Sequence, residues 1–142
     1  MRKYIFISIG GMLGAILRYV IRNTPISYYH GNIPINTLII NVTGSFILAL
    51  ILTMAWEIKE FNVDIRLGIA TGFIGSYTTF STLCKEFTTL FLEKSYFSAI
   101  LYVILSLILG IIAVYCGIIF ARKIIVNFIK KKEESVSKSG VE

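Results

Sequence analysis

Residues 72–83, GFIGSYTTFSTL, interrupt the third of four long apolar runs in this chain. The segment places two glycines and five serine or threonine hydroxyls among residues that are otherwise apolar enough for a lipid bilayer. Glycine lowers helix stability and hydroxyl side chains compete for backbone hydrogen bonds, so the segment predicts a broken third helix. A break at membrane depth either exposes carbonyls to a cation or is a local bend that the hydroxyls satisfy themselves.

The rest of the chain predicts an all-α membrane protein with four transmembrane helices. Hydrophobic residues make up 56% of the 142 residues, and the mean hydropathy is +0.78. Each apolar run is close to the roughly 20 residues that a helix needs to cross a bilayer. The predicted spans are residues 4–21, 35–56, 67–91 and 97–121.

Two further features describe how the chain is organised. Only residues 93–95 separate the third span from the fourth, so these two helices should be antiparallel neighbours. Residues 1–128 form the predicted membrane domain, and residues 129–142 are too polar to bury a core, which predicts a basic, disordered tail.

The net charge of +6 is unevenly distributed. Six of the basic residues lie at or beyond the end of the fourth span, which indicates contact with an anionic membrane surface rather than with nucleic acid. The side that holds both termini carries ten basic residues against four on the other side, which predicts cytoplasmic termini in a multi-pass cell-membrane protein. Without the tail the count is four against four, so the body has almost no preferred orientation.

Small residues mark sites where helices can approach closely. Gly10 and Gly14 have the Gly-x-x-x-Gly spacing, as do Gly68 and Gly72. This spacing is typical of close helix packing, either within one subunit or across a dimer. The two cysteines, Cys84 and Cys116, fall in predicted spans, and we expect buried thiols that pack as small hydrophobes.

Polar side chains recur on one face of the second span. Thr37, Asn41 and Ser45 are four residues apart. An amide at this depth needs partners, because burying it unpaired costs several kcal/mol, on the order of 2–7. Asn41 therefore either joins two helices or presents an N–H donor to a passing anion.

The fourth span has a similar stripe of Tyr102, Ser106 and Gly110. Tyr102 is alternatively an interfacial anchor, and Ser106 alternatively bonds to its own helix backbone. If this stripe and that of the second span face the broken segment, they form a narrow polar groove.

Three other residues, Phe80, Arg18 and Glu86, have two possible roles each. Phe80 and Leu83 share a helix face; a phenylalanine edge is electropositive and can touch an anion, although core packing is its commoner role. Arg18 either reaches the lipid headgroups or attracts anions at a vestibule. Glu86 either accepts hydrogen bonds from hydroxyls or pairs with a cation.

The sequence contains none of the common enzyme motifs. It lacks a phosphate-binding Gly-Lys-Ser/Thr loop, a His-Glu-x-x-His motif and a Cys-x-x-Cys motif. We therefore predict that the protein is not an enzyme.

Three segments together resemble the Fluc/CrcB fluoride channel family. They are GGMLGAILRY at residues 10–19, NTLIINVTGSF at residues 36–46, and GFIGSYTTFST at residues 72–82 followed by Glu86. The resemblance implies a four-helix subunit with a broken third helix, assembled as an antiparallel, dual-topology homodimer. It also implies two pores and a structural sodium ion at the centre of the dimer.

The resemblance assigns roles to individual residues. Asn41 becomes the pore asparagine and Phe80 one of two pore phenylalanines, while Leu83 occupies the place of the second and lacks its electropositive edge. The backbone carbonyls of Gly75 and Thr78 become the sodium ligands, a suitable environment for a hard cation. The remaining residues expected along the fluoride path are Thr37, Thr79, Ser81, Thr82, Tyr102 and Ser106, with Arg18 near a vestibule.

The implied function is passive, fluoride-selective export that relieves fluoride toxicity in the cytoplasm. Neutral hydroxyls and an amide can replace the water around fluoride and still release the ion. One alternative is a small multidrug-type proton-coupled antiporter, but residues 12–17 of the first span lack the carboxylate that it needs. Another alternative is a membrane scaffold that transports nothing.

Overall fold

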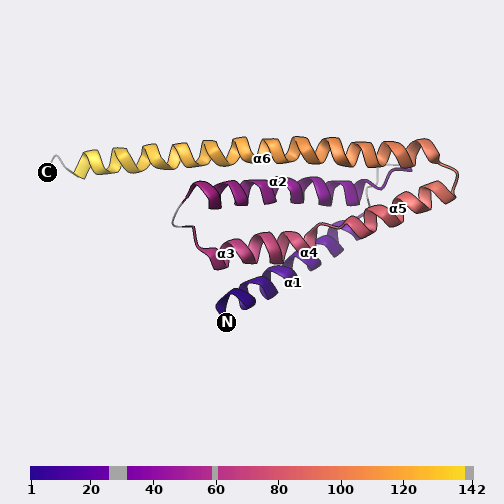
Figure 1. Ribbon diagram of the computed structural model, residues 1–142, viewed down its shortest axis with the longest axis horizontal. Helices are drawn as coiled ribbons and strands as arrows, with labels where there is room; N and C mark the ends of the chain where they lie inside the picture. The colour runs from indigo at the N-terminus through magenta and orange to yellow at the C-terminus, as the bar shows by residue number, and fades with distance from the viewer. Residues whose placement is uncertain (26–31, 59–60, 140–142) are drawn as a thin grey trace.

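The computed structural model describes residues 1–25, 32–58 and 61–139, with side chains up to residue 127. These residues form helices joined by short connections, and they contain no strand (Figure 1). Residues 26–31, 59–60 and 140–142 lie outside the described residues. In chain order the elements are α1 (Arg2–Asn23), α2 (Ile35–Glu57), α3 (Val63–Leu67), the π-helix η1 (Gly68–Ile74), α4 (Gly75–Tyr77), α5 (Phe80–Leu92) and α6 (Tyr96–Ser139).

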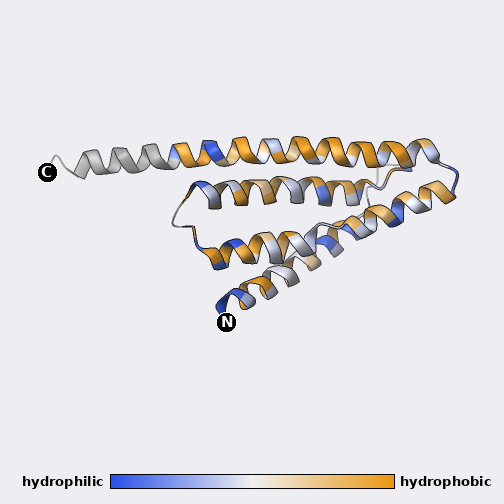
Figure 2. Cartoon of the chain, in the orientation of Figure 1, coloured by the Kyte–Doolittle hydropathy of each residue, from blue (hydrophilic) through white to orange (hydrophobic). Residues whose placement is uncertain are grey.

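Three of the helices are long and apolar enough to cross a membrane. They are α1, α2 and the Tyr96–Asn127 part of α6. Hydrophobic residues cover most of α6 as far as Asn127, whereas the α5–α6 turn and the N-terminus are hydrophilic (Figure 2). The third predicted span is divided among α3, η1, α4 and α5. The first three of these lie beside α1, and α5 continues toward the turn before α6 (Figure 1). The chain is thus a multi-pass membrane protein with four spans, one of them broken.

The helices form two packed pairs, and the first pair joins α2 to α6. Gly117 of α6 lies against the backbone carbonyl of Phe46, where an added Cβ would sit 2.6 Å from the oxygen. The rings of Phe46 and Phe120 pack 6.2 Å apart on the same seam. At the end of this seam, Nε of the exposed Arg122 donates to Glu57 Oε1 at 3.0 Å. Close backbone approach therefore aligns α2 with the longest helix.

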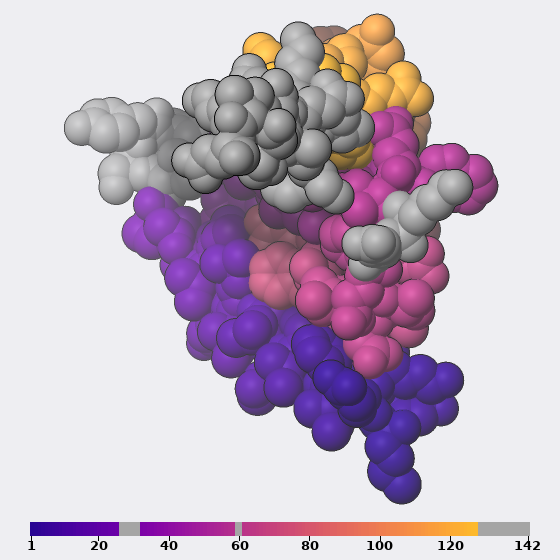
Figure 3. Space-filling view, turned by 90° about the vertical axis from the view of Figure 1, so that its left-hand side faces the viewer, coloured from indigo at the N-terminus to yellow at the C-terminus, as the bar shows by residue number. Residues whose placement is uncertain are grey.

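The second pair joins α1 to η1 through both Gly-x-x-x-Gly motifs. A Cβ at Gly10 would collide with the carbonyl oxygen of Gly68, and a Cβ at Gly14 with that of Phe73. A Cβ at Gly72 would in turn meet the backbone of Ile7. The two motifs thus pack against each other within one subunit. In Figures 1 and 3, α1 forms the edge of the molecule farthest from α6.

A tight turn at residues 93–95 reverses the chain between α5 and α6, which are antiparallel neighbours as predicted. The N–H of Ser95 donates to the carbonyl of Leu90 at 3.0 Å, and that of Lys94 to Phe91 at 3.1 Å. This pairing closes a helix with one left-handed residue, and Lys94 takes that conformation with φ of 62°.

Two further sequence predictions concern the cysteines and the end of the membrane domain. The expectation of buried thiols is wrong, because Cys84 and Cys116 are both exposed and free. Lipid tails are as apolar as a protein core, so an apolar residue in a membrane span can face lipid instead of the protein interior. The division of the chain at residue 128 stays a prediction; α6 continues through this position to Ser139.

Candidate ion pathway

The third span breaks between α4 and α5, where the backbone becomes extended. Thr78 has φ and ψ of −73° and 156°, and Thr79 has −150° and 115°. The predicted break is therefore confirmed, and it lies at the two threonines rather than at the glycines. The glycines instead lie in the wider η1 turn and at the start of α4.

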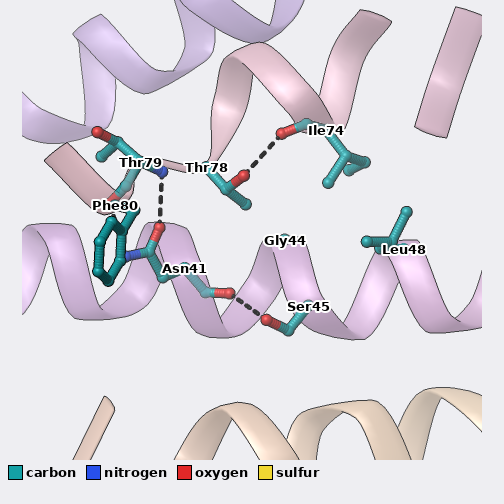
Figure 4. A pocket seen from close by; sticks show the side chains of 8 residues that line it. All are labelled: Asn41, Gly44, Ser45, Leu48, Ile74, Thr78, Thr79 and Phe80. Atoms are coloured by element: carbon teal, nitrogen blue, oxygen red, sulfur yellow. Dashed lines mark hydrogen bonds between the residues drawn. The ribbon is translucent and has the colours of Figure 1, made fainter. Parts of the chain in front are cut away.

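Asn41 of α2 pairs with the extended backbone at the break. Its Nδ2 donates to the carbonyl of Thr79 at 3.1 Å, and the N–H of Thr79 donates to Asn41 Oδ1 at 2.9 Å (Figure 4). The amide thus replaces the helical partners that Thr79 lacks. Because an amide NH2 carries two hydrogens, one N–H donor of Asn41 is left for another acceptor.

At the break, two backbone N–H groups do not form the usual hydrogen bonds of a helix. In a continuous helix the Thr79 N–H would donate to Gly75 and the Thr82 N–H to Thr78. Instead the Thr79 N–H goes to Asn41, and the Thr82 N–H goes to Thr79 Oγ1 at 3.2 Å. The carbonyls of Gly75 and Thr78 therefore lose their usual helical donors.

Three hydroxyls form a cluster at the start of α5. Thr79 Oγ1 donates to Thr82 Oγ1 at 3.0 Å and lies 3.3 Å from Ser81 Oγ. Each hydroxyl can donate one hydrogen, so Thr82 still has one to offer. The N-terminal turn of α5 thus presents neutral donors rather than fixed charges.

Two cavities flank the break, and Thr79 lines both of them. One has a volume of about 250 Å³ and is bordered by Asn41, Ser45, Thr78 and Phe80 (Figure 4). The second has a volume of about 290 Å³, and its lining comprises Ala15, Arg18, Tyr19, Arg22, Thr79, Ser81 and Thr82. The extended backbone is therefore a partition between an amide-lined space and a space lined by two guanidinium groups.

Glu86 of α5 is half-buried and receives two hydroxyl donors. Thr37 Oγ1 donates to Glu86 Oε1 at 2.9 Å, and the Tyr102 hydroxyl donates to Oε2 at 2.8 Å. Thr37 and Tyr102 are 1% and 0% exposed, so the carboxylate has a preorganised partner for each oxygen. Of the two partners considered for Glu86, the hydroxyls are present, and Tyr102 is buried rather than an interfacial anchor.

The other predicted residues occupy different environments. The Ser106 hydroxyl donates to the Tyr102 carbonyl at 2.8 Å, so its hydrogen serves its own helix. Ser45 does the same with the Asn41 carbonyl at 2.8 Å. Leu83 packs against the cluster that includes Leu90 and Tyr102. Neither Ser106 nor Leu83 lines the two cavities.

Phe80 and Arg22 complete the site. Phe80 borders the amide-lined cavity, yet it is 78% exposed, so its ring does not belong to the core of this chain. Arg22 was not among the predicted site residues. Its signal was present in the sequence, because Arg22 lies four residues after Arg18 and thus on the same face of α1.

Comparison with known proteins agrees with this arrangement. Residues 5–118 match the family described as CrcB-like protein, Camphor Resistance (CrcB). A protein of Sulfurihydrogenibium sp. (strain YO3AOP1) named fluoride-specific ion channel FluC is 37% identical over 122 residues, which cover 86% of this chain and 98% of the relative.

Two further relatives carry similar names. Fluoride-specific ion channel FluC 1 of Staphylococcus aureus (strain bovine RF122 / ET3-1) is 39% identical over 82% of this chain and 93% of its own length. Fluoride-specific ion channel FluC of Thermosipho melanesiensis (strain DSM 12029 / CIP 104789 / BI429) is 39% identical over 84% of this chain and 96% of its own length. A family match over most of the sequence and relatives of this identity, matched almost end to end, show that the chain belongs to the CrcB family, whose named relatives are channels rather than enzymes.

Proposed function

We propose that this protein is a fluoride-selective channel through which fluoride leaves the cytoplasm passively. The observation that carries the proposal is the pair of cavities that meet at Thr79, where guanidinium groups give way to neutral hydroxyls and an amide. The names of the relatives make fluoride the first anion to test.

The order of these groups suits a small, strongly hydrated anion. Arg18 attracts the ion, and the hydroxyls of Ser81 and Thr82 then take the place of part of its water. The free N–H of Asn41 is the next donor, on the far side of Thr79. Neutral donors bind an anion more weakly than a buried cation would, so the ion can move on.

We propose an antiparallel homodimer as the functional unit. The exposed ring of Phe80 supports this, because a second subunit can cover it and can use its electropositive edge at a pore. The exposed apolar side chains of α1, such as Ile5, Met12 and Ile16, provide further surface for lipid or a partner. The balanced charge of the body suits insertion in both orientations, whereas the basic tail opposes it.

A sodium ion is the proposed structural cofactor of that dimer. The carbonyls of Gly75 and Thr78 fit this role, because the N–H groups that would normally bond them are engaged by Asn41 and Thr79. Two such carbonyls from each subunit make an oxygen cage of the kind that hard cations prefer. The ion would hold the two breaks together without taking part in conduction.

The proposal is tested by fluoride and chloride efflux from liposomes that contain the purified protein. We expect fast fluoride efflux, negligible chloride efflux, and loss of fluoride efflux in Asn41→Asp and Phe80→Ile. Asn41→Asp places a negative charge where the anion passes, and Phe80→Ile removes the aromatic edge. Absence of fluoride efflux from folded wild-type protein would reject the channel and favour a scaffold.

Matched variants control for nonspecific damage. Phe97 on α6 is 79% exposed, so Phe97→Ile removes an equally exposed ring away from both cavities. Asn62 caps α3 by accepting from two backbone N–H groups, a role that aspartate also fills. Both Phe97→Ile and Asn62→Asp should keep wild-type fluoride efflux. Fluoride movement that requires a pH gradient would instead support a proton-coupled antiporter.

A further inference from the structure

The guanidinium-lined cavity has two arginines where one was predicted. Arg18 and Arg22 share a face of α1 with Ala15 and Tyr19, and this face lies opposite the hydroxyls at the start of α5. Arg18 is half-buried and Arg22 is exposed. The two cations therefore lie in series, with Arg22 one helical turn closer to the end of α1.

Neither arginine has an acidic neighbour within the part of the chain that the structure describes. Among the described residues, the one ion pair joins Arg122 to Glu57 at the opposite side of the body, and the lining of this cavity contains no carboxylate. The backbone at Arg22 is held in place by Asn36, whose Nδ2 donates to the Arg22 carbonyl at 2.9 Å and to the Thr24 carbonyl at 3.0 Å. An arginine near the C-terminus of a helix can itself donate to the last carbonyls. Because Asn36 already satisfies these carbonyls at the end of α1, the Arg22 side chain is free for another role.

We infer that Arg22 captures small inorganic anions at the outer end of this cavity and delivers them toward Arg18 and the hydroxyl cluster. This inference rests on the proposed channel function and adds a residue to it. Arg22 acts through its charge, which raises the local concentration of anions at an entrance with low-dielectric walls. It does not select among anions, because a guanidinium exposed to water attracts fluoride and chloride alike.

The test is the single-channel fluoride current in planar bilayers at a fixed fluoride concentration and varied ionic strength, set with the salt of an impermeant organic anion. At about 10 mM ionic strength the Debye length is about 30 Å, and at about 1 M it is about 3 Å. We expect Arg22→Gln to reduce the current about threefold at low ionic strength, as expected for a single charge within several ångströms of the path in water. At high ionic strength the variant and the wild type should carry equal currents, which also shows that the variant is folded.

Two further variants separate charge from other effects. Arg22→Lys keeps the charge and should behave as the wild type. Arg66 lies two residues before Gly68, and Gly68 packs on Phe6, which is about 24 Å along α1 from Arg22. Arg66→Gln therefore removes a distant guanidinium and should leave the current unchanged at every ionic strength.

The outcomes distinguish this inference from the proposed function. A wild-type protein that conducts fluoride, with an Arg22→Gln variant that matches it at low ionic strength, would overturn the role of Arg22 and leave the channel intact. An Arg22→Lys variant as impaired as Arg22→Gln would also overturn the inference, since charge would then not be the cause. A wild-type protein that carries no fluoride current would reject the channel itself and the inference with it.

Discussion

The two halves of the third span are stabilised by different interactions. Before the break, η1 packs on α1 through glycines so closely that the two backbones touch. After the break, α5 packs Leu90 against Tyr102 of α6, and polar side chains also join it to the other helices, with Glu86 bound by hydroxyls of α2 and α6. Ser76 belongs to the first region, since its hydroxyl donates to the Gly11 carbonyl at 2.8 Å.

This difference indicates a division of roles along one span. Contacts between backbones leave no space for an ion, so η1 is a rigid support whose sequence is constrained by shape. Hydrogen bonds between side chains leave cavities beside them, so α5 can combine stability with a path for an anion. Changes before the break should therefore affect mainly folding, and changes after it should affect transport as well.

The largest effect is expected from Gly10→Ala in the first region. The added methyl group would collide with the carbonyl oxygen of Gly68, and overpacking against backbone costs about 3 kcal/mol. Unfolding in mixed detergent micelles measures this loss. Gly110→Ala is the control, because nothing lies within 4 Å of its Cβ, and it should be neutral or slightly stabilising. Equal stability of the two variants would contradict the close packing of α1 on η1.

The next largest effect is expected from Asn41→Leu at the break. This change leaves the N–H and carbonyl of Thr79 without their partners, at a cost of about 2 kcal/mol. The same unfolding assay measures the loss, and fluoride efflux should disappear because the N–H donor is absent. Asn41→Asp retains the acceptor for the Thr79 N–H and should lose less stability. If Asn41→Leu were as stable as the wild type, the break would not depend on this amide.

A smaller effect is expected from Tyr102→Phe, which removes one donor from Glu86. Hydrogen bonds inside membrane proteins contribute about 0.6 kcal/mol on average, and a charged acceptor strengthens them, so a loss of about 1 kcal/mol is expected. Tyr115→Phe on the same helix is the control, because its side chain is 65% exposed. A larger loss for Tyr115→Phe than for Tyr102→Phe would argue against a structural role of the carboxylate network.

The smallest effect is expected from Lys94→Gly in the turn between α5 and α6, remote from both cavities. Glycine adopts the left-handed conformation without strain, but it also increases the entropy of the unfolded chain. The two terms partly cancel, so we expect a net stabilisation of about 0.5 kcal/mol with unchanged fluoride efflux. A lower unfolding midpoint would show that the Lys94 side chain contributes more than its strained backbone costs.

Several features could be predicted because they depend on local pattern. The length of the apolar runs predicted the helices, and the hydroxyl-rich segment predicted the break. The pairing of Thr37 and Tyr102 on one carboxylate could not be predicted, since periodicity places residues on a face but does not say which face meets which. The exposure of Cys84 and Cys116 was missed for a related reason, because lipid accepts the same apolar residues as a protein core.

Hydrophobicity, helix propensity and motif spacing, which are properties of the chain itself, were sufficient to determine a membrane protein of four spans and its family. Tertiary structure decided the exact site of the break and the partners of its polar groups. Asn41 can pair with Thr79 only because the packing of α2 brings the amide to that backbone. Arg22 joins Arg18 beside the hydroxyls only because the end of α1 and the start of α5 line the same cavity. Hydrogen bonds of this kind depend on distance and direction between separate helices, and these are set when the helices pack together.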